Sequence, residues 1–378
     1  MKRSKRGFRP SVVGLEKREV LSVFTVTNLG DSGPGSLRAA ITASNTNPAP
    51  AGSFNTVAFN PMLGGVIALT SGHLDITTPV HINDGTAGTA VNPNIVISGS
   101  NRSRIFETHG VAAEIDNLSL ENGRAASSNS TPGTGGGDGG AIQEDGGDLT
   151  LRDDTLANNF ATNRGGAVFN YYGTLNALGS SFYNNSTPHY GGAIYNSGTM
   201  TVSTQPGMSV FFLGNTAGEG GGAVENASSV LAIPQVVTAY IILSTFEANS
   251  AGSGGAIGNQ NGADLHLNGN TFIGNHASTN GGALLNSATA DDGTTVPPGN
   301  TTPLLGSTFE DNTAGIDGGA IYSQGALTLS AAAKPQTTIQ FNTAAPGGGG
   351  GVWVADPGKL TRNAAVIQFN TQPDVQFG

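Results

Sequence analysis

The sequence predicts an all-β protein, a right-handed parallel β-helix with a short N-terminal capping helix. Two motifs recur along its 378 residues: a Gly-Gly-Ala-aliphatic tetrad and, at a nearly fixed distance before most copies, Phe-x-x-Asn. A period of 26 to 37 residues indicates units that stack on their neighbours. A helical solenoid is excluded because a glycine pair in every unit would break its helices. The tetrad alanines are Ala141, Ala167, Ala193, Ala223, Ala256, Ala283 and Ala320, and the motif asparagines are Asn159, Asn185, Asn215, Asn249, Asn275 and Asn312.

One unit, from Gly191 to Asn215, shows how the chain forms a coil. The pair Gly191-Gly192 suits a sharp corner because glycine tolerates positive φ. Three short β-forming segments follow, at residues 193–196, 199–203 and 209–212, separated by turns at Gly198 and Pro206-Gly207. The unit therefore predicts three strands in each coil.

Aligning the units gives columns of residues. The column after the alanine is aliphatic and is expected to point inward; it contains Ile142, Val168, Ile194, Val224, Ile257, Leu284 and Ile321. The next column is mixed and is expected to point outward; it contains Gln143, Phe169, Tyr195, Glu225, Gly258, Leu285 and Tyr322. The third contains Asn170, Asn196, Asn226, Asn259, Asn286 and Ser323. Asparagines stacked at a turn satisfy backbone groups and bond to one another, so these columns are interpreted as structural.

Residues 24–45 predict a cap for the first coil. The pattern is a strand, a turn at Gly33-Pro34-Gly35, an N-cap at Ser36 and a short helix with Leu37, Ala40 and Ile41 on one face. A solenoid needs caps because its terminal coil is an unpaired sheet edge. We divide the chain into a basic export tail (1–22), an N-terminal cap (23–60), the β-helix (61–370) and a C-terminal cap (371–378).

Charge and composition limit the partners. Residues 1–18 contain seven Lys or Arg and one acid, a net +6, so the other 360 residues carry nine basic and 25 acidic side chains, a net −16. An acidic body disfavours nucleic acid as a partner, and a basic head is typical of a targeting segment. There is no cysteine and no apolar run of about 18 residues that would span a membrane.

The sequence gives little support for catalysis. Glycoside hydrolysis needs two carboxylates facing one sugar, and the outward column offers only Glu225. The pairs Asp153-Asp154 and Glu310-Asp311 are neighbours in a strand, so their side chains should face opposite ways. The six histidines lack metal-ligand spacing, and the single glycine-rich segment 135–142 resembles a Ca²⁺-binding repeat in one copy only. We therefore predict no catalytic residue, metal or cofactor.

One cluster is a candidate ligand-binding site. Five of the seven tyrosines lie between residues 171 and 195, with a phenylalanine beside them. Exposed aromatic rings suit sugar faces and protein contacts. The alternative is an aromatic ladder that stiffens the sheet. The candidate residues are Phe169, Tyr171, Tyr172, Tyr183, Tyr190 and Tyr195.

The two repeated motifs resemble the repeats of polymorphic outer membrane proteins and related β-helix adhesins of bacteria, over residues 118–370. Residues 24–45 resemble the CSLREA-type segment of secreted β-helix proteins, with Gly35 and Ala39 in place of its Cys and Glu. Residues 15–21 resemble the LEPR-XLL export signature. These resemblances imply a pectin-lyase-like solenoid at the bacterial cell surface or in the extracellular matrix, non-enzymatic and adhesin-like, that binds glycans or envelope proteins. The alternative is a carbohydrate-active β-helix enzyme, a polysaccharide lyase or a glycoside hydrolase.

Overall fold

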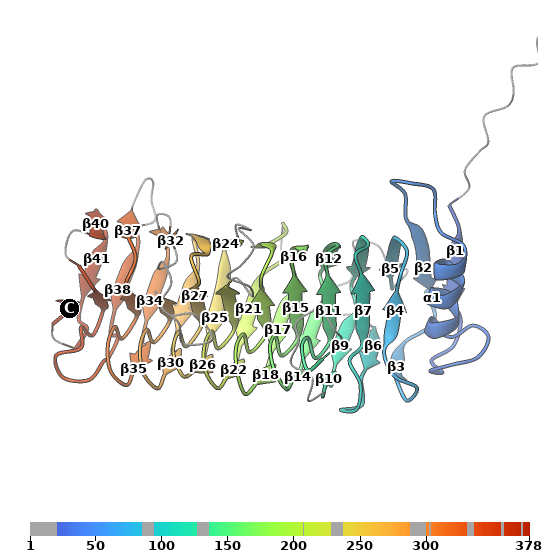
Figure 1. Ribbon diagram of the computed structural model, residues 1–378, viewed down its shortest axis with the longest axis horizontal. Coiled ribbons are helices and arrows are strands. Elements are labelled where there is room, and N and C mark those ends of the chain that lie inside the picture. Colours follow the sequence, from blue (N-terminus) through green and yellow to red (C-terminus); the bar gives the residue numbers. More distant parts are fainter. Residues whose placement is uncertain are drawn as a thin grey trace, which may run out of the picture.

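The computed structural model describes residues 21–84, 94–126, 136–206, 208–227, 237–287, 300–301, 304–330, 336–356, 359–371 and 373–378. The basic residues 1–20 and most of the loop from Ser127 to Gly140 lie outside this part of the chain. The described residues form a straight rod of stacked coils (Figure 1). The paired strands are parallel, and each coil passes through sheet C, sheet A, sheet B and, in seven coils, sheet D. The chain is a right-handed parallel β-helix, as predicted.

The strands of the four sheets follow in stacking order. Sheet A consists of β1 (Val23–Val26), β2 (Asn55–Phe59), β5 (Val80–Asn83), β8 (Ala113–Asp116), β12 (Asp148–Arg152), β16 (Thr174–Leu178), β20 (Thr199–Ser203), β24 (Thr238–Ile242), β28 (Asp264–Asn268), β33 (Leu304–Leu305), β37 (Leu327–Ser330) and β40 (Leu360–Asn363), with β32 (Asn300–Thr301) beside β28. Sheet B consists of β3 (Gly65–Ala68), β6 (Ile95–Ser98), β9 (Ser119–Glu121), β13 (Thr155–Ala157), β17 (Ser181–Tyr183), β21 (Val210–Leu213), β25 (Ser244–Glu247), β29 (Thr271–Ile273), β34 (Thr308–Glu310), β38 (Thr338–Gln340) and β41 (Val366–Gln368).

Sheet C consists of β4 (Leu74–Ile76), β7 (Phe106–His109), β11 (Ile142–Asp145), β15 (Val168–Tyr171), β19 (Ile194–Asn196), β23 (Val224–Ala227), β27 (Ile257–Gln260), β31 (Leu284–Asn286), β36 (Ile321–Ser323), β39 (Val352–Val354) and β42 (Val375–Phe377). Sheet D consists of β10 (Arg124–Ala125), β14 (Phe160–Ala161), β18 (Ser186–Thr187), β22 (Thr216–Ala217), β26 (Ser250–Ala251), β30 (His276–Ala277) and β35 (Thr313–Ala314). The three strands expected for residues 191–215 are confirmed as β19, β20 and β21. Sheet D was not predicted, because two residues are too few to show a strand pattern.

The core is built from the inward columns. The seven aliphatic residues that follow the tetrad alanines are completely buried, as predicted. Five phenylalanines of the second motif stack along sheet B, with ring centroids 4.6 to 4.9 Å apart. This spacing follows the strand separation, so the aromatic column continues from coil to coil. These rings are Phe182, Phe212, Phe246, Phe272 and Phe309.

The two glycines of the tetrad have different roles, shown by Gly191 and Gly192. Gly191 has φ +69°, which fits the predicted corner. Gly192 is not in the positive-φ region; instead, a Cβ there would lie 2.0 Å from the carbonyl oxygen of Gly222 in the next coil. The second glycine is therefore required because successive backbones approach closely at this point.

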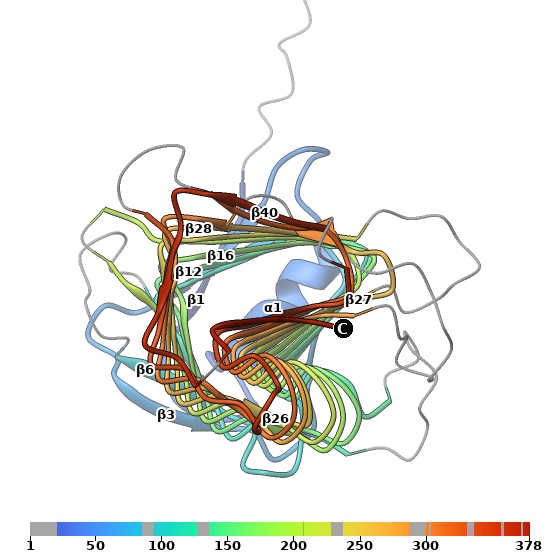
Figure 2. The same ribbon diagram turned by 90° about the vertical axis from the view of Figure 1, so that its left-hand side faces the viewer.

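The predicted N-terminal cap is present. Helix α1 (Leu37–Thr46) begins after Ser36, whose Oγ accepts a hydrogen bond from the Ala39 N–H at 3.2 Å. Leu37, Ala40 and Ile41 are buried. In the view along the rod, α1 lies across the N-terminal end of the lumen (Figure 2). At the other end β42 pairs with β39, so the segment expected as a C-terminal cap includes a strand that continues sheet C.

Candidate functional site

The expected outward column lies on the outer face of sheet C, but its centre is not exposed. The register aligns Gln143 with Phe169, Phe169 with Tyr195, and Tyr195 with Glu225. Phe169 and Tyr195 have no exposed surface, which corrects the expectation that they face solvent. The coils that contain sheet D form an extra lobe between sheets B and C, beside this face (Figure 2). Residues from the lobe cover the rings: Tyr190 packs against them, and the Arg164 guanidinium lies 5.0 Å from the Tyr195 ring centroid.

The structure brings together five of the six candidate aromatic residues. The Phe169 ring centroid lies 5.6 Å from that of Tyr195 and 5.8 Å from that of Tyr171. The Tyr171 and Tyr172 centroids are 4.3 Å apart, and Tyr190 packs on the same cluster. The sixth residue, Tyr183, lies on β17 in sheet B and pairs with neighbours there, so it belongs to another face.

Tyr171 and Tyr172 are the part of this cluster that reaches solvent on the sheet C side. Both are half-buried, and the Tyr171 ring stacks on the Phe169 ring. Burial raises the pKa of Tyr171, and the neighbouring Tyr172 and Asp145 raise it further. The phenol is therefore neutral at physiological pH, and a side-chain hydrogen bond with Tyr172 contributes to this shift.

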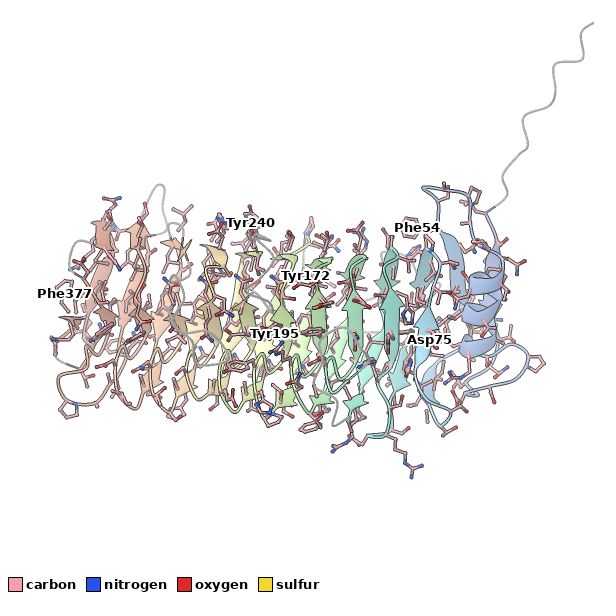
Figure 3. All side chains as sticks on the ribbon, viewed as in Figure 1. Phe54, Asp75, Tyr172, Tyr195, Tyr240 and Phe377 are labelled. Carbon is pink, nitrogen blue, oxygen red and sulfur yellow. The ribbon has the colours of Figure 1, made fainter. Side chains whose placement is uncertain are left out.

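Polar residues continue this surface toward the N-terminal end. In sheet C the register aligns His109 with Asp145 and Asp145 with Tyr171. Asp75 Oδ1 lies 3.2 Å from both His73 Nε2 and His109 Nε2, and His73 Nε2 lies 3.5 Å from Glu107 Oε2. We call His73, Asp75, Glu107, His109, Asp145, Tyr171 and Tyr172 the sheet C strip. Figure 3 shows Asp75 and Tyr172 on the side of the rod formed by sheet C.

Sequence reasoning missed the N-terminal half of this strip. Its residues lie before the first tetrad, in coils that lack the repeated motif. The signal that could have found them is the coil period, since Asp75 and Glu107 are 32 residues apart and directly in register.

Arg104 explains the segment that resembles a Ca²⁺-binding repeat. Its guanidinium is buried and donates to the carbonyl oxygens of Gly136, Asp138 and Gly139, at 2.7 to 3.0 Å, and to Glu107. A cation from the protein's own chain thus binds the carbonyls at the end of the glycine-rich loop. Within the described residues, no group of three or more His, Asp or Glu is arranged to hold a metal.

The other candidate carboxylates do not form a site. Glu225 is completely buried, and its Oε1 accepts a hydrogen bond from Gln260 Nε2 at 2.7 Å. Asp154 is buried, whereas Asp153 is in a left-handed turn conformation with φ +55°. Asp311 has a similar φ of +54°, directly after Glu310 at the end of β34. Neither adjacent pair therefore converges on a common substrate position.

A second exposed aromatic pair lies on sheet A. The Tyr240 and His266 ring centroids are 4.4 Å apart, and Tyr240 is 40% exposed. Tyr240 and His266 are aligned on the adjacent strands β24 and β28, whose alternation of inward and outward residues was not used in the sequence analysis. It provides a comparison for the sheet C strip, because Tyr240 is at least as accessible as the strip tyrosines.

No helix in the described part of the chain has the length and apolar character that a bilayer crossing requires.

No curated protein matches the chain. Among solved structures the chain is similar to the catalytic unit of a thermostable GH87 α-1,3-glucanase from Streptomyces thermodiastaticus strain HF3-3, with TM-score 0.38 and 14% identity, over 90% of this chain and 67% of that one. It is also similar to the Dettilon tailspike protein, with TM-score 0.33 and 11% identity, over 91% of this chain and 68% of that one.

The model of the Chlamydia polymorphic membrane protein repeat matches residues 179–197, 271–287 and 306–324. Each match runs from sheet B through the glycine pair to sheet C, so it covers the two motifs on which the fold prediction depends. The chain is therefore a right-handed parallel β-helix in which three coils match the polymorphic membrane protein repeat.

Proposed function

We propose that this protein is an exported, non-enzymatic β-helix of the bacterial surface or extracellular matrix that binds glycans through the sheet C strip. The repeat that it shares with Chlamydia polymorphic membrane proteins supports a surface location. The rod offers a long rigid face on which weak contacts can repeat. Phe169 and Tyr195 are buried, so the aromatic contacts of this face come from Tyr171 and Tyr172.

The observation that carries the proposal is the alignment of Tyr171 with Asp145 and His109 on three successive coils. Coils are about 4.8 Å apart, so aromatic, carboxylate and imidazole groups follow one another along the rod. An aromatic ring packs on the apolar face of a sugar. The carboxylate accepts hydrogen bonds from sugar hydroxyls, and the imidazole donates or accepts them.

The charge of the strip favours neutral glycans over acidic ones. Asp75, Glu107 and Asp145 are acidic, and the neighbouring Arg104 is buried against Glu107 and backbone carbonyls. The body as a whole carries a net charge of −16. An acidic polysaccharide would therefore be repelled at low salt.

The test uses the full chain on a glycan array. The double variant Tyr171→Ala, Tyr172→Ala should lose about ten-fold in affinity, as expected for two aromatic contacts. Tyr240→Ala is the matched control, because it removes an exposed tyrosine from sheet A. Loss of binding in the control alone would move the site to sheet A. Binding of envelope proteins without any glycan would assign the strip to a protein partner.

A second function has one observation in its favour. Asp75 and Glu107 are in register on adjacent strands, and His73 Nε2 lies within 3.2 and 3.5 Å of their respective oxygens. The two carboxylate oxygens are therefore at most roughly 7 Å apart, and this upper limit overlaps the separations found in glycoside hydrolases. Release of reducing ends from a neutral polysaccharide, abolished by Asp75→Asn but retained in the exposed Asp148→Asn, would support catalysis. Binding without release would leave the adhesin-like function.

A further inference from the structure

The asparagine column on sheet C has a direction. Nδ2 of Asn170 donates to Oδ1 of Asn196 at 2.7 Å, and Asn196 donates in the same sense to Asn226. The series continues through Asn259 and Asn286 to the Ser323 hydroxyl. Each Oδ1 accepts from the coil before it, so the first member, Asn170, needs a donor on its N-terminal side. Its Oδ1 is buried and has no such donor from an amide.

Glu144 occupies the position where that donor is needed. It is aligned with Asn170 in the register, and its side chain is completely buried. One oxygen, Oε1, accepts from the Gly147 N–H, whereas Oε2 is buried with no partner. The register places the two residues side by side on adjacent strands, and their unpartnered oxygens, Glu144 Oε2 and Asn170 Oδ1, are both acceptors when the carboxyl is ionised. A proton on the carboxyl turns one of them into a donor.

Asp154, at the next corner of the same coil, is also a buried acid with one paired and one unpaired carboxyl oxygen. Its Oδ1 accepts from the Leu118 N–H at 2.8 Å, while Oδ2 is buried with no partner. Asn270 occupies this corner four coils later. Its Oδ1 accepts from the Ser244 N–H at 2.9 Å, and its Nδ2 donates to a backbone carbonyl, that of Ile241, at 2.8 Å. By analogy, Oδ2 of Asp154 corresponds to Nδ2 of Asn270 and can donate in the same way only when the carboxyl is protonated.

We propose that Glu144 and Asp154 are held as carboxylic acids, Glu144 in an asparagine position at the start of the sheet C column and Asp154 in the position that Asn270 has four coils later, and that this makes the coil β11–β13 stable in acid and weaker as the pH rises. A different ladder, formed by the asparagines that follow the sheet B strands from Asn159 to Asn370, shows the contrast at its C-terminal end. There Asp374 Oδ1 accepts from both the backbone N–H and Nδ2 of Asn370, at 3.0 and 3.1 Å. An ionised carboxylate can accept from the last asparagine of a ladder, whereas only a protonated carboxyl can donate to the first one.

The electrostatic surroundings favour the neutral form of both acids. Burial raises the pKa of Glu144 to about 8, opposed by the Gly147 and Gly146 amides and reinforced by Asp145 and Asp148. Thr108 and Asn170, its neighbours in the column, are uncharged. Glu144 has an ordinary value of 4.5, so an unfolded chain releases this proton near pH 4.5 and the folded chain near pH 8. The stabilisation is greatest below pH 4.5 and falls as the pH rises through 8.

Burial also raises the pKa of Asp154 well above its ordinary value. The Leu118 amide and the backbone at Arg152 oppose the shift, and the acids Asp116 and Asp153 reinforce it. The Arg152 guanidinium is directed elsewhere, 3.7 Å from both Glu114 and Asp116. Both buried acids therefore act in the same sense on the pH dependence of stability.

The test is thermal unfolding of the full chain at pH 5 and pH 9. Glu144→Gln supplies an amide donor of the same shape, and Asp154→Asn does so at the second corner. Each variant should unfold at least roughly 2 °C above the wild type at pH 9, with a smaller difference at pH 5. Glu247→Gln, at an exposed position on β25, is the matched control and should change neither value.

A second measurement does not depend on the unfolding temperature. Infrared spectra of the wild type at pH 7 should show the C=O band of protonated carboxyl groups, and each single variant should reduce its intensity. The proposal is overturned if this band is unchanged in both variants. It is also overturned if both variants are less stable than the wild type at pH 9.

Discussion

Nδ2 of Asn196 donates a hydrogen bond to Oδ1 of Asn226, 2.7 Å away in the next coil. Both side chains are completely buried, so neither amide can exchange this bond for water. A buried polar group left without a partner costs more than the bond itself contributes. The ladder therefore makes each coil depend on its two neighbours.

Replacing Asn196 or Asn226 by alanine should lower the free energy of unfolding by about 1–3 kcal/mol, because the neighbouring amide groups lose their partners. Denaturant titration of each variant measures this loss. The control is Asn268→Ala, at an exposed position at the end of β28. Equal stability of all three variants would contradict a stabilising ladder.

Gly192→Ala should destabilise the protein by roughly 3 kcal/mol or more, since a backbone shift is needed to relieve the contact with the Gly222 carbonyl. Gly262→Ala tests conformation alone: this glycine has φ +73° and no atom within 4 Å of an added Cβ. Its cost should be about 1 kcal/mol. Calorimetry of the two variants compares the effects, and a larger loss at Gly262 would show that backbone approach does not limit the fold.

The double variant Phe169→Ala, Tyr195→Ala should lose folding stability, contrary to the expectation for outward rings. Both side chains are fully buried, and truncating one such ring costs about 3 kcal/mol or more. Near-ultraviolet circular dichroism during heating reports the loss of packing. Tyr240→Ala, which is 40% exposed, should melt like the wild type. An unchanged melting curve for the double variant would show that the lobe does not seal this cluster.

A chain that starts at Ser22 should unfold at the same temperature as the full chain but remain in the cytoplasm. Ser22 lies at the start of the part of the chain that the structure describes, and its carbonyl accepts a hydrogen bond from the Thr56 N–H at 2.9 Å. Residues before it contain the basic segment interpreted as an export tail. Fractionation of expressing cells measures export, and normal secretion of the shortened chain would refute that role.

The repeated motifs by themselves determined the architecture. Glycine pairs, inward aliphatic residues and turn asparagines follow the coil period, and each is dictated by backbone conformation or by stacking on an identical neighbour. Ser36 and the apolar face of α1 could likewise be predicted, because an N-cap and its helix are local in sequence. In a repeat protein, each motif residue contacts the equivalent residue of the next unit, so the motif itself predicts the contact.

Tertiary structure decided which of these residues reach solvent and which acids keep their proton. Phe169 points away from the main core, as the alternation predicts, yet the lobe that carries Tyr190 and Arg164 covers the same face. Glu144 lies in a column of asparagine amides. Its burial and the unpaired Oδ1 of Asn170 both favour a protonated carboxyl that can donate a hydrogen bond. Alternation fixes the direction of a side chain relative to its strand, whereas exposure and protonation depend on what packs against it from other coils.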